Sequence, residues 1–215
     1  MKLTIEQIID RLQRNDSFMS CVTEWRQIAA QEAAFADYPE KVDERLVRAL
    51  ELHGIKRLYT HQAEAIRYAL DSQNTTIVTP TASGKTLCYN IPILHTIIQT
   101  LEARALYLFP TKALAQDQIN ELHTIIARVS DAIPFSIKSY TFDGDTPVSA
   151  RKSIKSSGHI VVTNPDMLHT GILPHHTQWI KLFENLRFIV IDEIHQYRGV
   201  FGSHMANVLR RLKRI

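Results

Sequence analysis

The sequence predicts an α/β fold in which a parallel sheet is flanked by helices and preceded by a small helical N-terminal segment. From residue 60 onward, short Val-, Ile- and Leu-rich runs alternate with longer helical segments. Most of these runs are continuous rather than alternating, which is typical of parallel strands covered on both faces. With 215 residues, 45% of them hydrophobic, the chain suits one main domain with an appendage. We therefore expect a helical extension in residues 1–54 and an α/β domain in residues 55–215.

The N-terminal extension is expected to contain two helices. Thr4 and Gln7 form a capping-box pattern ahead of an apolar stripe that begins at Ile5. A second helix is expected near Asp43–His53 and should end at Gly54, which tolerates the left-handed conformation of a helix end.

In the main domain we expect five strands, with a helix after each of them. The expected strands are Thr76–Thr79, Ala105–Phe109, Phe135–Tyr140, His159–Thr163 and Phe188–Ile191. The expected helices lie near Lys85–Leu101, Lys112–Val129, Pro147–Ser156, Gln178–Leu186 and Ser203–Ile215. Because such sheets bind ligands beyond the carboxyl ends of their strands, function is expected in the segments that directly follow the strands.

The first of these segments is Thr79-Pro-Thr-Ala-Ser-Gly-Lys-Thr86. A strand, a tight turn and a helix start point several backbone N–H groups at one anion. Lys85 adds a positive charge for the β- and γ-phosphates of ATP, and the Thr86 hydroxyl is placed to ligate Mg²⁺. The strict phosphate-loop pattern has Gly where Thr79 stands, so a plain Ser/Thr-rich turn is the structural alternative. The residues expected to hold the phosphates are Thr81, Ala82, Ser83, Gly84, Lys85 and Thr86.

The acidic cluster Asp192-Glu-Ile-His195 follows the last expected strand. Asp192 would hold the same Mg²⁺ from the far side, and Glu193 is the candidate base that activates the attacking water. The structural alternative is an ordinary acidic helix start. Both motifs together, in this order and each after a buried-type strand, favour ATP binding with Glu193, Lys85 and Asp192 as the catalytic residues.

Other helix starts offer contacts to a base and to a phosphodiester backbone. Gln62 is suited to contact adenine through its carboxamide while Tyr59 packs beside the base; a capped helix with a surface Gln is the alternative. Backbone amides and side chains at two further helix starts could bind phosphates, or simply cap surface helices. The nucleic-acid candidates are Pro110, Thr111, Lys112, Gln116, Thr163 and Asn164.

Composition sets limits on function and location. A net charge of +3 is too small to indicate nucleic-acid binding by itself. Only Cys21 and Cys88 are present, so we expect no cysteine-based zinc site, and a reducing cytoplasm fits. No signal-peptide core and no apolar run of membrane-spanning length is found, so we expect a cytoplasmic protein without a membrane partner.

Taken in order, these segments resemble the first motor domain of superfamily 2 helicases of the DExH type, a RecA-like domain. The resemblance runs from about residue 55 to 215: Thr60–Gln62 is similar to the adenine-sensing motif, Thr79–Thr86 to motif I and Asp192–His195 to motif II. Pro110–Gln116 is similar to motif Ia and Thr163–Asp166 to motif Ib. Tyr197-Arg-Gly-Val-Phe-Gly-Ser-His204 resembles most closely the branch of bacterial mitomycin-repair DNA helicases and their yeast-type relatives.

The resemblance implies ATP-dependent translocation on single-stranded or tailed DNA with 3′-to-5′ polarity, and a role in DNA repair. His195 is then expected to couple the ATP site to the nucleic-acid track. RNA in place of DNA stays an alternative, because phosphate contacts do not identify the sugar.

The departure from the family lies after the acidic cluster. The Ser-Ala-Thr coupling motif, the second RecA-like lobe with its arginine finger and the zinc-binding domain of this branch are not in the sequence. An arginine finger contributes on the order of 10³–10⁵ in rate. We therefore expect weak ATP binding and negligible hydrolysis by this chain alone, and a partner lobe supplied in cis or in trans. The chain is interpreted as a fragment, a truncated product or half of a split enzyme.

Two rival functions remain open. One is a binding protein without turnover, for which the terminal basic cluster Arg210–Arg214 offers a surface; a solvated helix face is its plain interpretation. The other is a metal-dependent hydrolase that uses His175 and His176 with the acidic cluster. Adjacent histidines point apart, and their spacing lacks a recognised ligand pattern.

Overall fold

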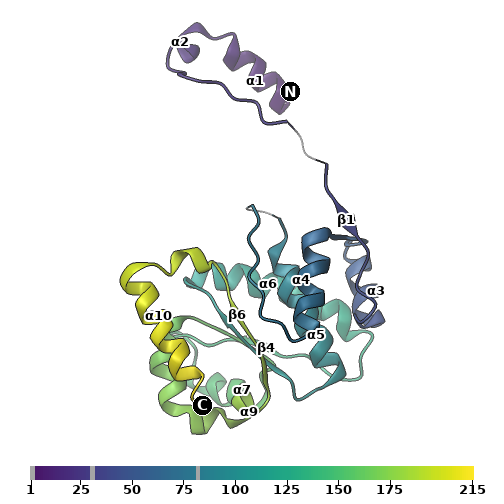
Figure 1. The fold of residues 1–215 in the computed structure, drawn as a ribbon, viewed down its shortest axis with the longest axis vertical. Coiled ribbons are helices and arrows are strands. Elements are labelled where there is room, and N and C mark those ends of the chain that lie inside the picture. The colour runs from purple at the N-terminus through teal and green to yellow at the C-terminus, as the bar shows by residue number, and fades with distance from the viewer. Residues whose placement is uncertain (1–2, 30–31, 81–82) are drawn as a thin grey trace. The chain divides into compact units, whose positions relative to one another are not determined.

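The structure is a computed structural model that describes residues 3–29, 32–80 and 83–215. The chain divides into two compact units, Met1–Ala33 and Ala34–Ile215 (Figure 1). The expected domain boundary after residue 54 stays a prediction. In the structure, the helix Glu44–Leu52 belongs to the second compact unit, because its Leu46 and Leu50 are fully buried in the main hydrophobic core.

The first unit contains the helices α1 (Ile5–Gln13) and α2 (Asp16–Met19). The predicted capping box is confirmed: the Gln7 amide donates to Thr4 Oγ1 over 3.3 Å, and the Thr4 amide donates to Gln7 Oε1 over 3.1 Å. No residue of α1 is buried, and its apolar stripe is exposed.

The second unit is built on a parallel sheet, which confirms the predicted fold class. Its strand order is β4-β5-β3-β6. In this sheet Leu108 lies opposite Thr163 on one side and Ile191 on the other, so three strands end at the same edge. The strands are β3 (Arg104–Leu108), β4 (Ser139–Thr141), β5 (Ile160–Thr163) and β6 (Leu186–Ile191), and a separate antiparallel pair joins β1 (Phe35–Ala36) to β2 (Leu58–Tyr59).

The expected strand Thr76–Thr79 is wrong. The described residues 73–80 form no strand, and Val78 is 88% exposed. Among the described residues, β6 hydrogen-bonds to β3 alone. The threonines and the Ile77-Val78 pair carry β propensity, but a strand also needs a neighbour to pair with, and local pattern does not supply one.

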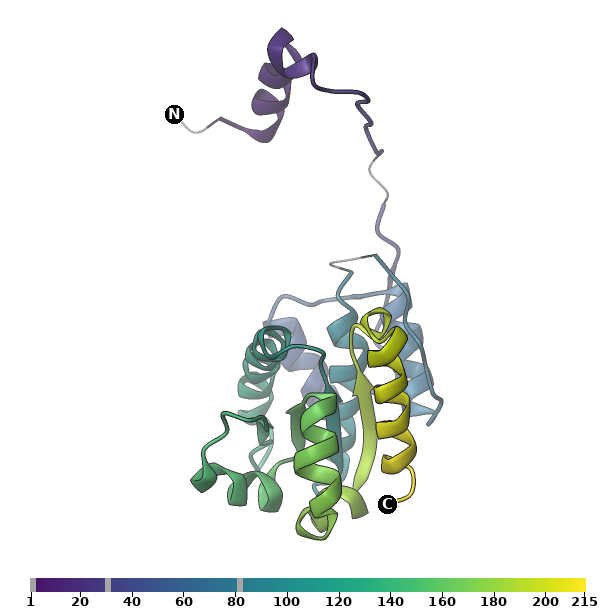
Figure 2. The ribbon, with the colours of Figure 1, turned by 90° about the vertical axis from the view of Figure 1, so that its left-hand side faces the viewer.

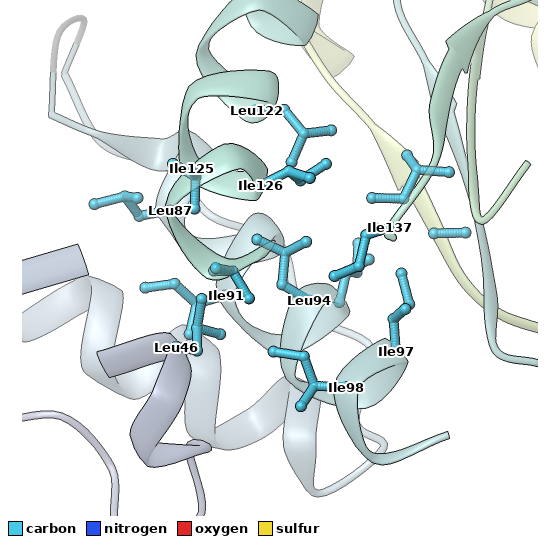
Figure 3. Packing of buried hydrophobic residues seen from close by; sticks show 14 of the residues in the cluster. Leu46, Leu87, Ile91, Leu94, Ile97, Ile98, Leu122, Ile125, Ile126 and Ile137 are labelled. Atoms are coloured by element: carbon cyan, nitrogen blue, oxygen red, sulfur yellow. The ribbon is translucent and has the colours of Figure 1, made fainter. Parts of the chain in front are cut away.

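Helices cover both faces of the sheet, as Figures 1 and 2 show. Because side chains alternate along a strand, Ala105 and Tyr107 face one hydrophobic cluster and Leu106 and Leu108 face the other. The first cluster includes α3 (Glu44–Leu52), α5 (Lys85–Gln99) and α6 (Lys112–Ser130), whose side chains pack as in Figure 3. The second includes α7 (Val148–Ser157), α9 (Ile180–Glu184) and α10 (Gly199–Leu212).

Short helices complete the unit. They are α4 (Thr60–Leu70), α8 (Pro165–Met167), the π-helix η1 (Leu168–Ile172) and the 3₁₀ helices η2 (Leu173–Trp179) and η3 (Ile194–Gln196). The last helix begins at Gly199, ahead of the predicted Ser203. None of the helices in the described ranges is long and apolar enough to cross a membrane.

His159 is a buried titratable group next to the start of β5, 6% exposed. Its Nδ1 accepts a hydrogen bond from the Lys138 amide over 3.0 Å. Burial, with the charges of Arg104 and Lys138, lowers the pKa of His159 to about 4. The folded protein therefore keeps this imidazole neutral at pH values where the unfolded chain protonates it.

Acidification is expected to destabilise the protein through His159. Between about pH 6.5 and pH 4 the unfolded chain binds a proton that the folded chain refuses, so stability falls as pH drops, by about 3 kcal/mol over that window. His159→Asn, whose Oδ1 can replace Nδ1 as the acceptor, should show a shallower loss in urea unfolding at several pH values. His53→Asn, at an exposed position, is the matched control; equal slopes for His159→Asn and the wild type would contradict the prediction.

Candidate nucleotide and nucleic-acid site

The carboxyl edge of the sheet gathers the predicted site residues. The Asp192 amide donates to the Leu108 carbonyl over 3.1 Å, and the Phe109 amide donates to the Thr163 carbonyl over 3.0 Å. These bonds extend the strand pairing past β3, β5 and β6. As a result, the segments that begin at Pro110, Asn164 and Asp192 leave the sheet side by side.

The phosphate loop ends in a left-handed residue. Gly84 has φ +71°, a conformation that glycine adopts without strain. A Cβ at Gly84 would lie 2.6 Å from Gln62 Nε2. Gln62 Nε2 itself donates to the Gly84 carbonyl over 2.8 Å, and His61 Nε2 lies 3.1 Å from the Ser83 carbonyl. The start of α4 therefore holds the end of the loop from the side.

Lys85 spans the loop. Its Nζ donates to the Thr79 carbonyl over 3.1 Å and to the Pro80 carbonyl over 3.0 Å. The hydroxyls of Thr79 and Ser83 share a further hydrogen bond. The predicted phosphate contacts Thr81 and Ala82 lie outside the described residues.

Gln62 and Tyr59 lie next to this loop. Gln62 is 3% exposed, and its Oε1 accepts from the Tyr59 amide over 2.9 Å, so both ends of its carboxamide bond within the chain. The predicted adenine contact of Gln62 would therefore use the second N–H or the second lone pair of this buried carboxamide, or replace one of these two bonds. Tyr59 stacks between His61, at 5.7 Å, and Phe35, at 5.2 Å between ring centroids. Phe35 was missed by sequence reasoning, and it is 48% exposed beside Tyr59.

Asp192 is half-buried at the end of β6. Burial raises the pKa of its carboxyl group, with a contribution from the charge of Glu193. The Glu193 amide, the Tyr89 hydroxyl and the positive charge of Lys85 act in the opposite direction. Lys85 and Asp192, which are more than one hundred residues apart in the chain, therefore lie within electrostatic reach of each other.

Glu193 adopts an unusual backbone conformation, with φ +51° and ψ 42°. Non-glycine residues at positive φ carry strain that is common at functional sites. Its amide donates to Asp192 Oδ1 over 2.8 Å, and its Oε2 lies 3.3 Å from His195 Nε2. The candidate base is thus paired with the candidate coupling residue.

The two predicted Mg²⁺ ligands are linked by two residues that the sequence analysis did not identify as site residues. The Thr86 hydroxyl donates to Gln118 Oε1 over 2.8 Å, and the Tyr89 hydroxyl lies 3.2 Å from the same oxygen. The Tyr89 hydroxyl also lies 3.4 Å from Asp192 Oδ2. Thr86 and Asp192 therefore belong to one small polar cluster and offer a hydroxyl and a carboxylate, oxygen donors of the kind that Mg²⁺ prefers.

The nucleic-acid candidates Thr111, Lys112 and Asn164 also meet at this edge. Together with the turn residue Asp143 they line one small cavity of about 10 Å³. Thr111 Oγ1 accepts from the Leu114 amide over 3.4 Å as the N-cap of α6, and Asn164 Oδ1 accepts from the Met167 amide over 2.8 Å. Lys112 forms an exposed ion pair with Asp145 of the intervening turn.

The other candidates are less accessible or lie to the side. Thr163 is 3% exposed, and its hydroxyl donates to the Phe142 carbonyl over 2.6 Å. Gln116 lies exposed on α6 and donates to Asn120 Oδ1 over 3.0 Å. Pro110 lies between β3 and α6. These roles stay predictions.

The metal-hydrolase alternative finds no support in the geometry. Within the ranges that the structure describes, no group of three or more His, Cys, Asp or Glu side chains could hold a metal ion. His176 Nδ1 lies 3.1 Å from the Leu173 carbonyl, and His175 is exposed on η2.

Comparisons with known proteins agree with this geometry. Residues 59–215 match the family described as DEAD/DEAH box helicase. The chain is 55% identical over 214 residues to the uncharacterized ATP-dependent helicase YprA of Bacillus subtilis (strain 168), covering 100% of this chain and 28% of the relative. It is 35% identical over 212 residues to the ATP-dependent helicase HRQ1 of Saccharomyces cerevisiae, covering 99% of this chain and 19% of the relative.

A solved structure shows the same fold. The crystal structure of the DUF1998 helicase MrfA bound to DNA and AMPPNP matches 99% of this chain and 29% of its own, with a TM-score of 0.90 and 54% sequence identity. This chain thus spans less than a third of the length of each of these relatives. The sequence resemblance is confirmed: the chain belongs to the DEAD/DEAH box helicase family and carries its RecA-like ATP-binding domain.

Proposed function

We propose that this chain is the ATP- and nucleic-acid-binding first lobe of an ATP-dependent DNA helicase. The observation that carries the proposal is the cluster of Thr86, Gln118, Tyr89 and Asp192, which joins the two nucleotide motifs over bonds of 2.8–3.4 Å. Motifs that are remote in the chain therefore contribute to one polar cluster, and this supports binding of a magnesium–triphosphate group there.

Each residue has a chemical role at that position. Bound Mg²⁺ would neutralise charge on the phosphates and orient them. The Lys85 ammonium exchanges its hydrogen bonds to two loop carbonyls for hydrogen bonds to phosphate oxygens. Thr86 and Asp192 supply oxygen ligands to Mg²⁺. Glu193 holds the attacking water and takes its proton, and its contact with His195 offers a route by which the state of this base reaches the nucleic-acid side.

The proposed nucleic-acid track runs over the helix starts at Thr111, Lys112 and Asn164. MrfA, which shares 54% of the sequence, is described in its crystal structure as bound to DNA, and this favours DNA over RNA. In a protein that also carries a second lobe, we propose that ATP turnover drives 3′-to-5′ translocation and serves DNA repair. The second lobe supplies the arginine finger.

Lys112→Ala is expected to weaken binding of a fluorescent single-stranded oligonucleotide, measured by anisotropy at several salt concentrations. Removing one phosphate contact should reduce the slope of log affinity against log salt by about 0.7. Asp145→Asn should act in the opposite direction, because the exposed ion pair of Lys112 with Asp145 competes with the phosphate. Deoxyribo- and ribo-oligonucleotides competing at fixed salt decide between DNA and RNA.

The control for this titration is Lys56→Ala, which removes an exposed lysine elsewhere on the second unit. Unchanged affinity and salt slope for Lys112→Ala would place the nucleic-acid track elsewhere. If Lys112→Ala and Lys56→Ala lost equal amounts of affinity for the oligonucleotide, the interaction would be a non-specific attraction by net charge.

A further inference from the structure

The hydroxyl of Thr86 has a hydrogen-bond partner that neither nucleotide motif provides. It donates to Gln118 Oε1 over 2.8 Å, across 32 residues of chain. Gln118 lies on α6, the helix that starts at Lys112. A hydrogen bond thus connects α6, whose first residues are proposed to bind nucleic acid, to the proposed Mg²⁺ ligand Thr86.

This bond fixes the direction of the hydroxyl. A threonine hydroxyl carries one proton and two acceptor lone pairs. When its proton is given to Gln118, the two lone pairs face away from Gln118 and stay free to accept. The Asp192 carboxylate has other donors, the Glu193 amide at 2.8 Å and the Tyr89 hydroxyl at 3.4 Å. The contacts of the described residues therefore assign the Thr86 proton to Gln118.

Tyr89 connects Gln118 to the other proposed ligand. The Tyr89 hydroxyl carries one proton that it can donate. The Tyr89 oxygen lies 3.2 Å from Gln118 Oε1 and 3.4 Å from Asp192 Oδ2, so its one proton can be donated to either acceptor. Because a carboxamide oxygen has two lone pairs, Gln118 can accept from Thr86 and Tyr89 together.

Gln118 is held in place by its neighbours on α6. Leu122, one turn after Gln118, packs in the hydrophobic cluster with Leu87 and Ile91 of α5 (Figure 3). Leu114, one turn before Gln118, is partly buried against the same cluster. Gln118 is thus a polar residue in an otherwise apolar row. A carboxamide anchored in this way is preorganised to act as an acceptor.

We propose that Gln118 is a positioning residue for Mg²⁺, because its carboxamide oxygen orients the Thr86 hydroxyl so that its lone pairs face the cation. Outer partners of metal ligands commonly contribute 10- to 100-fold to metal affinity. The inference rests on the proposed nucleotide function, and it adds a residue of α6 to the machinery that binds Mg²⁺ with ATP.

The experiment separates metal binding from nucleotide binding. A fluorescent ATP analogue is titrated into the 215-residue chain in EDTA, and Mg²⁺ is then titrated at a fixed concentration of the analogue. Gln118→Met, which keeps the size of the side chain and removes the acceptor, should raise the Mg²⁺ midpoint by about 10-fold and leave the affinity in EDTA nearly unchanged. Gln118→Glu, which keeps an acceptor oxygen, should restore a midpoint close to the wild type.

A double-mutant cycle and a matched control complete the design. Thr86→Val removes the hydroxyl, so adding Gln118→Met to it should cause little further loss. Asn120→Leu changes an exposed amide on the same helix and should leave the midpoint unchanged. Circular dichroism checks that each variant is folded. If the Gln118→Met variant does not fold, Gln118→Ala takes its place.

The outcomes are distinct. If Gln118→Met has the Mg²⁺ midpoint of the wild type, the positioning role is overturned while the nucleotide function stands. The same holds if Gln118→Met loses affinity for the analogue equally in EDTA and in Mg²⁺. Failure of the wild-type chain to bind the analogue under either condition overturns the proposed function itself, and the inference with it.

Discussion

Trp179→Ala is expected to lower the free energy of unfolding by about 3–5 kcal/mol, which is the range for truncating a large buried aromatic residue. Trp179 is 0% exposed. Its ring meets Phe142 edge-on at 4.7 Å between centroids, and the Lys155 ammonium lies 5.8 Å from the ring. Small domains are stable by only about 5–15 kcal/mol, so this one change removes a large share of the total.

The control for this prediction is the second tryptophan of the chain. Trp25 is 41% exposed in the first unit, and Trp25→Ala should change stability by less than about 1 kcal/mol. Urea unfolding followed by far-ultraviolet circular dichroism compares the two variants without relying on the fluorescence of the residues replaced. Similar midpoints for Trp179→Ala and the wild type would show that Trp179 does not anchor the second hydrophobic cluster.

Lys85→Ala is expected to weaken binding of an ATP analogue by about 10- to 100-fold, since hydrogen bonds from a charged group contribute about 1.5–3 kcal/mol. In the structure Lys85 Nζ bonds two loop carbonyls, at 3.0 and 3.1 Å. Its loss therefore removes the phosphate contact and also frees the loop. Isothermal titration calorimetry in Mg²⁺ gives the affinity, and a thermal melt reports whether the fold is retained.

Lys56→Ala again serves as the charge-matched control, because Lys56 is exposed and is not one of the proposed site residues. If Lys85→Ala bound the analogue as tightly as the wild type, the proposed phosphate contact of Lys85 would be contradicted. A parallel loss in Lys56→Ala would point to charge alone and not to a contact at the loop.

The strands were predictable where the sequence itself contains a continuous apolar run. The β3 and β5 runs are continuous and apolar, and the structure places both in the middle of the sheet. Thr76–Thr79 shows the limit of this reasoning. Its residues have β propensity, but pairing depends on which strand lies beside it, and that is a contact between distant parts of the chain.

The site residues were predictable where a local motif identifies them, and they were missed where they depend on contacts between distant parts of the chain. Asp192 follows an expected strand that the structure contains, so the strand-end rule places it at the carboxyl edge. The strand expected before Lys85 is not formed, and Lys85 was predictable from the Gly-Lys-Thr pattern of the loop itself. Gln118 lies in mid-helix and reaches the site only because α6 packs against the core. The one signal for it is local: a glutamine in the apolar row between Leu114 and Leu122. Phe35 reaches Tyr59 through the antiparallel β1–β2 pair, and its two-residue strand is too short to recognise from sequence.

The place of β6 at the end of the sheet has a consequence for handling the protein. β6 has β3 as its sheet partner on one side, and its Ile189 is 43% exposed. Six residues with a single charge and no proline, at a sheet border, are a ready template for adding another extended segment. We therefore expect concentrated samples of this chain to aggregate along Leu186–Ile191.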